Sequence, residues 1–490
     1  MSGPVARWTF EAIVETQTAT HLGGGDGGAA DLTIGRDALS GRPLLPGTTL
    51  AGLLRNYLVA CDTGYYSPEG RGGPAERLFG ASSGNDYGTQ SAAITFDAIA
   101  EPDAKPVEIR DGVAIDGSTG TAADHAKYDF EVLAPGTRFP IRVDLVVRSA
   151  VGSEGEDDLV SWAARALLGL QHGAIHLGAK ASRGLGRIAV HSWQVERFPL
   201  TSEADCARWL ASDHARPGQK MSPQEDVLEA MSTVRGTRVE PAGNGPRPAL
   251  SFEVPVRFEE PLLIGAPGAD AAAPDDVHLT AGGRPILSGT SAAGVLRHRA
   301  WAITELVHDE NPANELINFL FGPKLPERET SRAKRPAVQQ SRIWFDEDVI
   351  DRATDSTNKT VGREERRTRV ALDRFTGGVL SGRLFEQQPY VGGQVRLKAE
   401  VKSVAGGVSS SVAAGLLVLM YRDVLDGLVT FGGQEATGFG LVAAHGEATV
   451  TMGDGRSGSL HSPLAEELVS AFCSWDGKTN IDSSALGAPT

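Results

Sequence analysis

The stretch GRPLLPGTTLAGLLR at residues 41–55 decides the fold, because it returns as GRPILSGTSAAGVLR at residues 283–297. The two stretches lie 242 residues apart and align without a gap. In each, a Gly-Arg-Pro turn signal precedes a run of apolar residues at helical spacing. A long stretch that recurs in this way indicates internal repetition, so we expect two copies of one unit of roughly 200 residues.

Further motifs recur in the same order in both halves. Each half opens with a strand-like segment, at residues 10–14 and 252–256, and closes with a glycine loop, at residues 178–186 and 432–440. The intervening pairs are LFG at 78–80 and 320–322, ITFD at 94–97 and IWFD at 343–346, VAID at 113–116 and VALD at 370–373, and FE at 130–131 and 385–386. One pair alone would be weak evidence, whereas the shared order establishes a tandem duplication.

Within each copy the local patterns alternate between strands and helices. One helix is predicted with Thr48 or Thr49 as its N-cap, and a second from about Asp158. The apolar stripe of the first helix consists of Leu50, Leu53, Leu54, Tyr57 and Leu58. Strands are predicted at residues 92–96, 139–147 and 188–195. This order favours an α+β fold with two tandem ferredoxin-like (RRM-like) domains, each with helices on one face of its sheet and with long loop insertions.

Composition shifts along the chain suggest the domain boundaries. Residues 201–248 are polar and rich in Pro, Gly, Arg and Glu, and residues beyond 454 are rich in Gly and Ser. The predicted parts are a first domain at 1–200, a linker at 201–248, a second domain at 249–453 with an arginine-rich insertion at 323–374, and a C-terminal tail at 454–490.

The composition excludes several classes of protein. Three isolated cysteines make a disulfide framework or a zinc knuckle improbable. Neither a leader-like apolar region near the N-terminus nor a membrane-span-length apolar run is present, so we expect a soluble, cytoplasmic protein. The net charge of −15 argues against a stand-alone nucleic-acid-coating protein. The insertion 323–374 nevertheless holds 13 Lys/Arg against 10 Asp/Glu, which fits either a solvated loop or a local phosphate-binding face.

Several motifs together resemble a known family. They are DLTIGRD at 31–37, LPGTTLAGLLR at 45–55, KYDFEVLAPGT at 127–137, SRGLG at 182–186 and, in the second half, ALDRFTGG at 371–378. This set is similar to the RAMP superfamily, and most of all to the backbone subunits of type III CRISPR effector complexes. Because both halves match, the chain looks like a fused double backbone subunit, as found in some type III-D systems.

The resemblance implies a function and a set of partners. Such subunits bind the guide CRISPR RNA along a ferredoxin-like palm, and a protruding thumb displaces one base at regular intervals. The expected partners are the guide, a complementary target RNA, and other type III subunits: the large polymerase-like subunit, further backbone subunits and small subunits. No membrane is expected among the partners.

The resemblance also points to an active-site aspartate. Asp31 matches by position the single aspartate with which some members cut target RNA, six residues ahead of Asp37. Its carboxylate could hold Mg²⁺ or another divalent cation near the scissile phosphate together with RNA, or orient the 2′-hydroxyl for attack. On the residues alone, Asp31 reads first as a turn or cap residue in a glycine-rich loop, and the resemblance is what favours a catalytic role. In the second copy Asp276 lies in the equivalent loop, three residues before Leu279 as Asp31 lies before Ile34, and is either a second nuclease residue or a remnant.

Basic and hydroxyl side chains in the shared motifs are the candidates for RNA contacts. They are Arg36, Thr48, Thr49, Arg55, Lys180, Ser182, Arg183, Ser291, Arg297, Arg369 and Arg374. The family often has a lysine in the Pro-Gly helix where this chain has Ala51 and Ala293. The second glycine loop carries Gln434, Glu435 and Thr437, so we expect it to bind RNA less by charge than the first.

Two other functions remain open. The chain could be a purely structural RNA-binding subunit without chemistry. It could instead be a guide-processing ribonuclease that uses a histidine, for which His21 is the best candidate among His21, His125, His172 and His176. The spacing of His172 and His176 would suit a helical metal pair, but the nearby glycines disfavour a continuous helix there.

Overall fold

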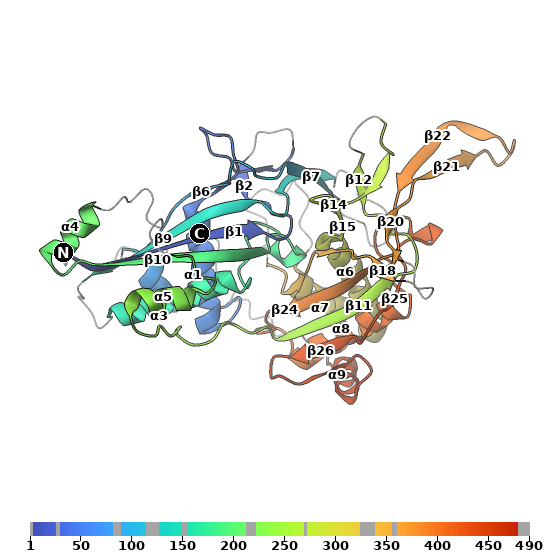
Figure 1. The fold of residues 1–490 in the computed structure, drawn as a ribbon. Helices are drawn as coiled ribbons and strands as arrows, with labels where there is room; N and C mark the ends of the chain where they lie inside the picture. Colours follow the sequence, from blue (N-terminus) through green and yellow to red (C-terminus); the bar gives the residue numbers. More distant parts are fainter. Residues whose placement is uncertain are drawn as a thin grey trace, which may run out of the picture. The chain divides into compact units, whose positions relative to one another are not determined.

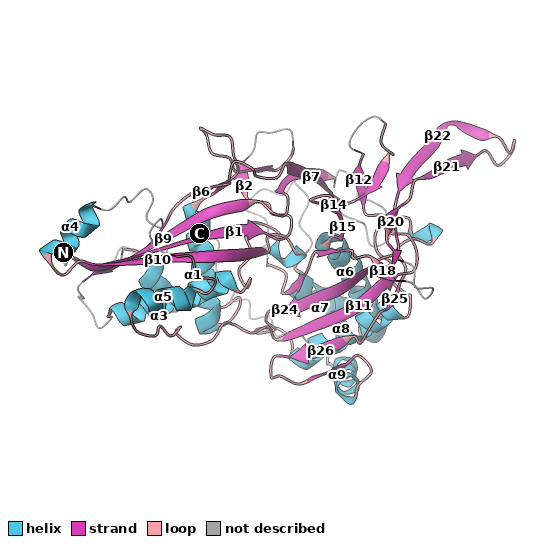
Figure 2. Ribbon diagram, in the orientation of Figure 1, coloured by secondary structure: helices cyan, strands magenta, loops and turns pink. Residues whose placement is uncertain are grey.

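The protein is described by a computed structural model that divides into two compact units (Figure 1). The described residues are 3–25, 30–81, 90–113, 127–148, 155–211, 222–268, 272–323, 339–354 and 360–478. The first unit is built mainly from residues 1–246 and the second from 247–490, and the short segment Ser182–Gly184 groups with the second. Both units mix helices and strands (Figure 2), which confirms the α+β class.

A four-stranded antiparallel sheet forms the centre of the first unit. Its strands are β1 (Pro4–Thr16), β5 (Ala93–Thr95), β9 (Arg138–Arg148) and β10 (Ile188–Pro199), and their order across the sheet is β10-β1-β9-β5. Successive side chains of a strand point to opposite faces. In β1 this places Trp8, Phe10 and Val14 in the core, each at most 1% exposed.

The two predicted helices, α1 (Gly47–Thr63) and α3 (Glu156–Gln171), pack on the first sheet through their apolar faces. Helices α2 (Pro74–Phe79) and α5 (Val227–Arg235) add buried residues to the same core, and α4 (Glu203–Ala211) has no buried residue. Leu50, Leu54 and Leu58 of α1 are buried, as predicted. The predicted N-cap is wrong, because α1 begins at Gly47 with Pro46 in the cap position and no side chain capping it. Proline fits this position since its fixed φ suits the extended cap residue.

The second unit repeats the arrangement of the first. Along the chain run β11 (Leu250–Phe258), α6 (Gly289–Val307), α7 (Glu310–Phe321), β16 (Ile343–Phe345), β24 (Gln394–Val401), α8 (Ser410–Leu425), β25 (Val442–Ala444), β26 (Thr449–Met452) and β27 (Ser457–Ser459). Its sheet has the order β16-β24-β11-β26-β27, with β25 also paired to β11. In both sheets the first strand lies between the third and the fourth, which are β9 and β10 in the first sheet and β24 and β25 in the second, so the duplication extends to topology.

Three helices lie in the segments that the sequence suggested were linker and tail: α4 and α5 in the linker and α9 (Pro463–Cys473) in the tail. In α5, Val227 and Met231 are fully buried against the core of the first unit. In α9, Leu468 and Phe472 are fully buried against the second core, and Ser462 caps the helix. The apolar pattern of residues 464–472 predicts a short helix within the Gly- and Ser-rich tail, whereas α5 lies in a segment whose overall composition is polar. The first unit thus carries α4 and α5 after β10, and the second carries α9 after β27.

Short strands and hairpins surround the two sheets. In the first unit they are β2 (Gly23–Gly25), β3 (Thr33–Ile34), β4 (Leu44–Leu45), β6 (Ala98–Ile99), β7 (Val107–Gly112) and β8 (Tyr128–Leu133). In the second they are β12 (Gly265–Pro267), β13 (Asp276–His278), β14 (Thr280–Ala281), β15 (Arg284–Leu287), β17 (Asp348–Val349), β18 (Ala353–Thr354), β19 (Thr360–Val361), β20 (Arg363–Glu364), β21 (Arg367–Leu372), β22 (Val379–Gln388) and β23 (Tyr390–Val391). Among the described helices, none is long and apolar enough to cross a membrane.

Candidate functional site

Asp31 is held by a reciprocal pair of hydrogen bonds with Asp129 at the start of β8. The backbone N–H of Asp31 donates to Oδ1 of Asp129 at 2.6 Å, and the N–H of Asp129 donates to Oδ2 of Asp31 at 3.1 Å. The next residue, Leu32, forms a parallel bridge with Phe130. Asp31 itself is exposed. The loop therefore presents a fixed carboxylate to solvent beside a second one, an arrangement that the sequence did not reveal.

Glu131, two residues further along β8, fixes the other end of this loop. Its carboxylate accepts from the N–H of Ile34 at 3.0 Å and from Nη2 of Arg36 at 3.3 and 3.4 Å. Arg36 is thereby oriented at the surface, with 41% of its side chain exposed. Asp129 and Glu131 alternate along one strand, so a single element positions both Asp31 and Arg36.

Two carboxylates can hold a divalent cation only with help from other ligands. Within the described residues, no group of three or more histidine, cysteine or acidic side chains is arranged to bind a metal. Mg²⁺ is often bound by one or two carboxylates plus substrate phosphates, with water completing the shell. Asp31 and Asp129 do not form a metal site made by the protein alone. They fit a site that is completed by the substrate, in which RNA would supply the remaining ligands.

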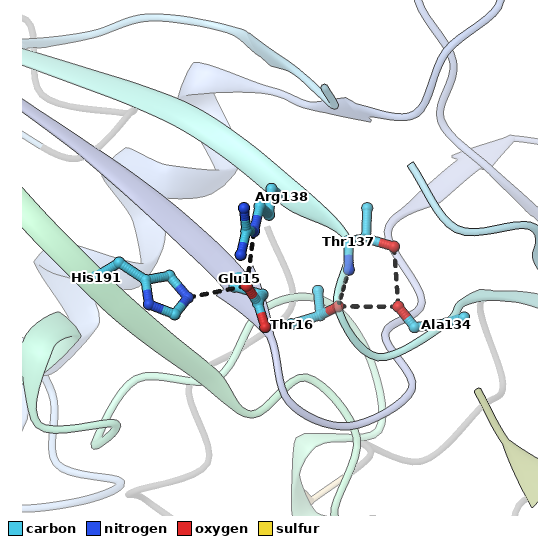
Figure 3. A network of polar contacts seen from close by, with 6 residues as sticks. All are labelled: Glu15, Thr16, Ala134, Thr137, Arg138 and His191. Atoms are coloured by element: carbon cyan, nitrogen blue, oxygen red, sulfur yellow. Dashed lines mark hydrogen bonds and ion pairs between the residues drawn. The ribbon is translucent and has the colours of Figure 1, made fainter. Parts of the chain in front are cut away.

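A buried network of threonines anchors the far end of β8 (Figure 3). Oγ1 of Thr16, at the end of β1, donates to the carbonyl of Ala134 at 3.0 Å and accepts from the N–H of Thr137 at 3.0 Å. Thr137 Oγ1 also donates to Ala134 at 2.9 Å. Both threonines are fully buried. The network ties the turn between β8 and β9 to the central strand of the sheet and so fixes the strand that carries Asp129.

An ion-pair cluster lies beside this network (Figure 3). Glu15 accepts from Nε of Arg138 at 2.7 Å and pairs with Nε2 of His191 at 2.9 Å (Figure 3). Partial burial acts to raise the pKa of Glu15, but the hydrogen bonds from Arg138 and His191 outweigh it and lower the pKa. The cluster adds support to the same end of the sheet.

His21 supports the site from inside the fold. It is 5% exposed, its Nδ1 lies 2.7 Å from the carbonyl oxygen of Glu131, and its ring packs edge-on to Phe130. Since a carbonyl can only accept, Nδ1 carries the proton and donates it to Glu131. His172 caps the end of α3, and Nδ1 of His176 lies 3.2 Å from the carbonyl of Leu185. His125 falls outside the described residues.

The glycine loop of the first unit closes over the same region. The N–H of Ala179 donates to the carbonyl of His21, and a side chain at Gly178 would collide with that carbonyl. Gly178 has φ +78°, which only glycine adopts without strain. Lys180 follows, and its ammonium group donates to the hydroxyl of Tyr128 and lies 4.3 Å from the ring centroid of Phe130. Consecutive residues of β8 therefore contact the acid, Asp31, and the cation, Lys180.

The second unit has the same hairpin, but its register shifts the expected correspondence. Oδ2 of Asp275 accepts from the N–H of Glu386 at 2.9 Å, and Asp276 forms a parallel pair with Gln387. Asp275 thus stands where Asp31 stands in the first unit. Asp276 stands at the place of Leu32, one residue further along the strand than the sequence comparison placed it.

Several arginines predicted to contact RNA are engaged within the protein. Arg55 forms a bidentate ion pair with Glu69, at 3.0 and 2.9 Å. Arg297 donates to the carbonyl of Gly322 at 2.5 Å and to Asn318 at 2.9 Å, and burial lowers its pKa. Arg183, which groups with the second unit, donates to the carbonyl of Phe321 at 3.3 Å. Burial, with a smaller contribution from Arg297, lowers the pKa of Arg183 to about 10.

The other predicted RNA-contacting residues differ in exposure. Thr48 is exposed, Thr49 and Ser291 are partly buried, and Ser182 is buried. Arg374 is exposed and stacks on Phe375 at the end of the β21–β22 hairpin, 4.6 Å from the ring centroid.

The comparison with known families explains the duplicated architecture. The family model of the RAMP superfamily matches residues 13–189 and again residues 256–443. The chain belongs to the RAMP superfamily. Each match falls in one half of the chain, and together they include the two glycine loops and the strands β5, β9, β16 and β24 of the two sheets. Members of the RAMP superfamily are CRISPR-associated RNA-binding proteins that in general bind CRISPR RNA and other effector subunits. No curated protein matches the chain.

Proposed function

We propose that this RAMP protein is a guide-RNA-binding backbone subunit of a type III CRISPR effector complex that also cleaves complementary target RNA at Asp31. The observation that carries the proposal is the reciprocal pairing of Asp31 with Asp129, which presents an exposed carboxylate on a fixed backbone. An aspartate that served only to cap a turn would need only the hydrogen bond that its carboxylate accepts, whereas Asp31 also donates its N–H to Asp129. The same pairing position returns in the second copy as Asp275 with Glu386.

The strand order supports the fold that this function requires. In each unit the chain runs strand, helix, strand, strand, helix, strand, and the first strand lies between the third and the fourth. This is the order of a ferredoxin-like sheet, which serves as the RNA-binding palm in our proposal. The β21–β22 hairpin serves as a thumb. It extends away from the second sheet (Figure 1) and exposes Leu372, Phe375 and Leu384 by more than half of their surface.

The chemistry at Asp31 is the cleavage of one phosphodiester bond. The target's 2′-hydroxyl attacks the adjacent phosphorus, the bond from phosphorus to the 5′-oxygen breaks, and a cyclic phosphate and a 5′-hydroxyl result. Asp31 either orients the 2′-hydroxyl and takes its proton or helps Asp129 to hold a divalent cation. The cation, when bound with RNA, would neutralise charge on the phosphate. Base pairing with the guide selects the target, so the protein needs only backbone contacts.

A guide-processing reaction at His21 has less support. The His21 imidazole is buried and uses Nδ1 to hold Glu131, so RNA would have to displace part of the loop to reach it. A purely structural subunit without chemistry remains the alternative that the experiment below must separate from cleavage.

The decisive experiment compares two aspartates of the same loop in the assembled complex. Asp31→Asn keeps the shape of the side chain and its acceptor oxygen but removes the charge, so target binding should persist and cleavage at one position should fall at least about 100-fold. The measurement is the cleavage rate of a labelled complementary RNA with Mg²⁺.

Asp37→Asn is the matched control. Asp37 is exposed, and its carboxylate accepts from the N–H and hydroxyl of Ser40, both at 2.7 Å, which lowers its pKa. Cleavage should therefore stay near the wild-type rate in this variant. Unchanged cleavage by Asp31→Asn at every position would leave only the structural function. Metal-independent cleavage of guide precursor that His21→Gln abolishes would favour processing instead.

A further inference from the structure

The two glycine loops share an unusual backbone but differ in one side chain. Lys180 has φ +61° and Gln434, at the same place in the second loop, has φ +66°. Residues other than glycine seldom adopt this left-handed backbone conformation, so its appearance at both positions indicates that they are equivalent. The preceding residues also make equivalent contacts. The N–H of Ala179 donates to the carbonyl of His21, and the N–H of Gly433 donates to the carbonyl of Leu263, which lies 242 residues after His21. The second loop has therefore lost the cation of the first.

A cation from another element meets the second loop at this position. Arg369, on β21 of the hairpin, points Nη1 toward Oε1 of Gln434 and Oγ1 of Thr437, each at 3.3 Å. Its guanidinium also lies over the ring of Phe439, 4.9 Å from the centroid. In the first unit the Lys180 ammonium likewise lies over aromatic rings, those of Tyr128 and Phe130. Each loop thus has a positive charge set on an aromatic face. Arg367 also lies over Phe439, 5.5 Å from the centroid, but its Nε is paired with Glu365 at 2.9 Å.

Arg369 keeps donors available for a ligand. Within the described residues its hydrogen bonds come from Nη1 alone, so Nε and Nη2 can face a further acceptor. A guanidinium can give two parallel N–H bonds to one phosphate, and an aromatic surface on one side restricts competing water. Arg369 is also close to Asp275 through strand pairing. It pairs with Phe385 on β22, and the next residue, Glu386, donates its N–H to Asp275.

We propose that Arg369 makes, in the second copy, the RNA-phosphate contact that Lys180 makes in the first. The inference rests on the proposed RNA-binding function but is independent of cleavage. It assigns the charge to the hairpin rather than to the glycine loop, so the second copy binds RNA by charge as the first does. The β21–β22 hairpin and the second glycine loop must then stay in contact for Arg369 to bind the phosphate.

The test measures how RNA affinity depends on salt. Each phosphate contact made by a cation contributes about 0.7 to the slope of log affinity against log salt for a single strand. The full-length chain is titrated with a fluorescent single-stranded RNA in EDTA, which stops metal-dependent cleavage. Lys180→Gln and Arg369→Gln should each lower the slope by about 0.7 and the affinity several-fold. Arg369→Lys should restore the slope, because it restores the charge, with an affinity below wild type because the fork is lost.

Arg456→Gln provides the matched control for loss of an arginine. Arg456 is paired with Asp454 and Glu467, away from the loop and the hairpin, and its variant should keep the wild-type slope. If Arg369→Gln binds with the wild-type slope while Lys180→Gln does not, Arg369 is only a clamp between hairpin and loop and the inference fails. It fails equally if Arg369→Gln weakens binding but Arg369→Lys does not restore the slope. Absence of RNA binding by the wild-type chain would instead refute the proposed function.

Discussion

At the scale of single residues, His278 is the histidine whose environment is most informative. It lies on β13, 4% exposed, with Nδ1 accepting from the N–H of Ile264 at 3.3 Å and Nε2 lying 3.1 Å from the carbonyl of Ile286. The neutral ring satisfies one donor and one acceptor at once. Burial lowers its pKa to about 4, against the smaller opposing effect of the backbone hydrogen bonds. His278 therefore holds the hairpin that carries Asp275 only while it is uncharged.

This environment predicts a loss of stability in acid. The folded pKa is depressed below the unfolded value of about 6.5, so the unfolded state binds the extra proton first. The contribution is fully present above pH 6.5 and declines as the pH falls toward 4, by up to about 3 kcal/mol. Denaturant unfolding across this range would measure it. His278→Gln should flatten the dependence of the unfolding free energy on pH between pH 6.5 and 4. His445→Gln, at an exposed position, should leave that dependence unchanged. Equal pH dependence in the wild type and His278→Gln would contradict the assignment.

The sequence predicted residue types at the site better than it predicted their positions. Asp31 could be singled out because its motif precedes a recognisable helix. The second acid could not be placed, because the stretch between it and the Gly-Arg-Pro motif is two residues shorter and a shift of one residue in a strand reverses the facing of side chains. Asp129 gave no local signal, since an acid in an alternating strand is ordinary. The intramolecular hydrogen bonds of Arg55 to Glu69 and of Arg297 to Gly322 could not be predicted, because the partners lie 14 and 25 residues away and outside the motif that carries each arginine.

At the scale of elements, β8 is the strand on which the candidate site depends. Its start carries Asp129, and its end is tied to β1 by the Thr16 network. Long helices such as α1 and α3 could be predicted from their apolar periodicity, because packing follows the same stripe. Short helices such as α5 and strands such as β8 could not, since their few buried residues gain meaning only from their tertiary partners.

Removing the Thr16 hydroxyl should loosen β8 without touching the site. Thr16→Val keeps the volume but leaves the buried N–H of Thr137 without its 3.0 Å acceptor and the Ala134 carbonyl with one donor fewer. We expect a loss of about 1–3 kcal/mol in unfolding free energy, together with faster amide exchange in β8. Thr16→Ser keeps the hydroxyl and should lose less. If both variants exchange β8 amides at the wild-type rate, the network does not hold the strand.

At the scale of the whole molecule, fusion allows two equivalent sites to differ. The copies share strand order, loop backbone and the acid-bearing hairpin. They differ in the residue whose N–H reaches the loop aspartate, Asp129 in the first copy and Glu386 in the second. They also differ in the element that carries the proposed cation and in the long exposed β21–β22 hairpin of the second unit. Because both copies belong to one chain, their ratio is fixed at one to one, and each can adapt to its own position along an RNA.

The register of the second hairpin predicts which acid governs a second cut. If both copies cleave, target RNA should be cut at two positions, and Asp31→Asn should remove one of them. Asp275→Asn should remove the other, because Asp275 receives the N–H of Glu386 as Asp31 receives that of Asp129. Asp276→Asn should leave both cuts, because its position matches Leu32. Mapping the product ends for the three variants separates these outcomes. Loss of the second cut in Asp276→Asn with retention in Asp275→Asn would show that the sequence spacing, and not the strand register, identifies the acid.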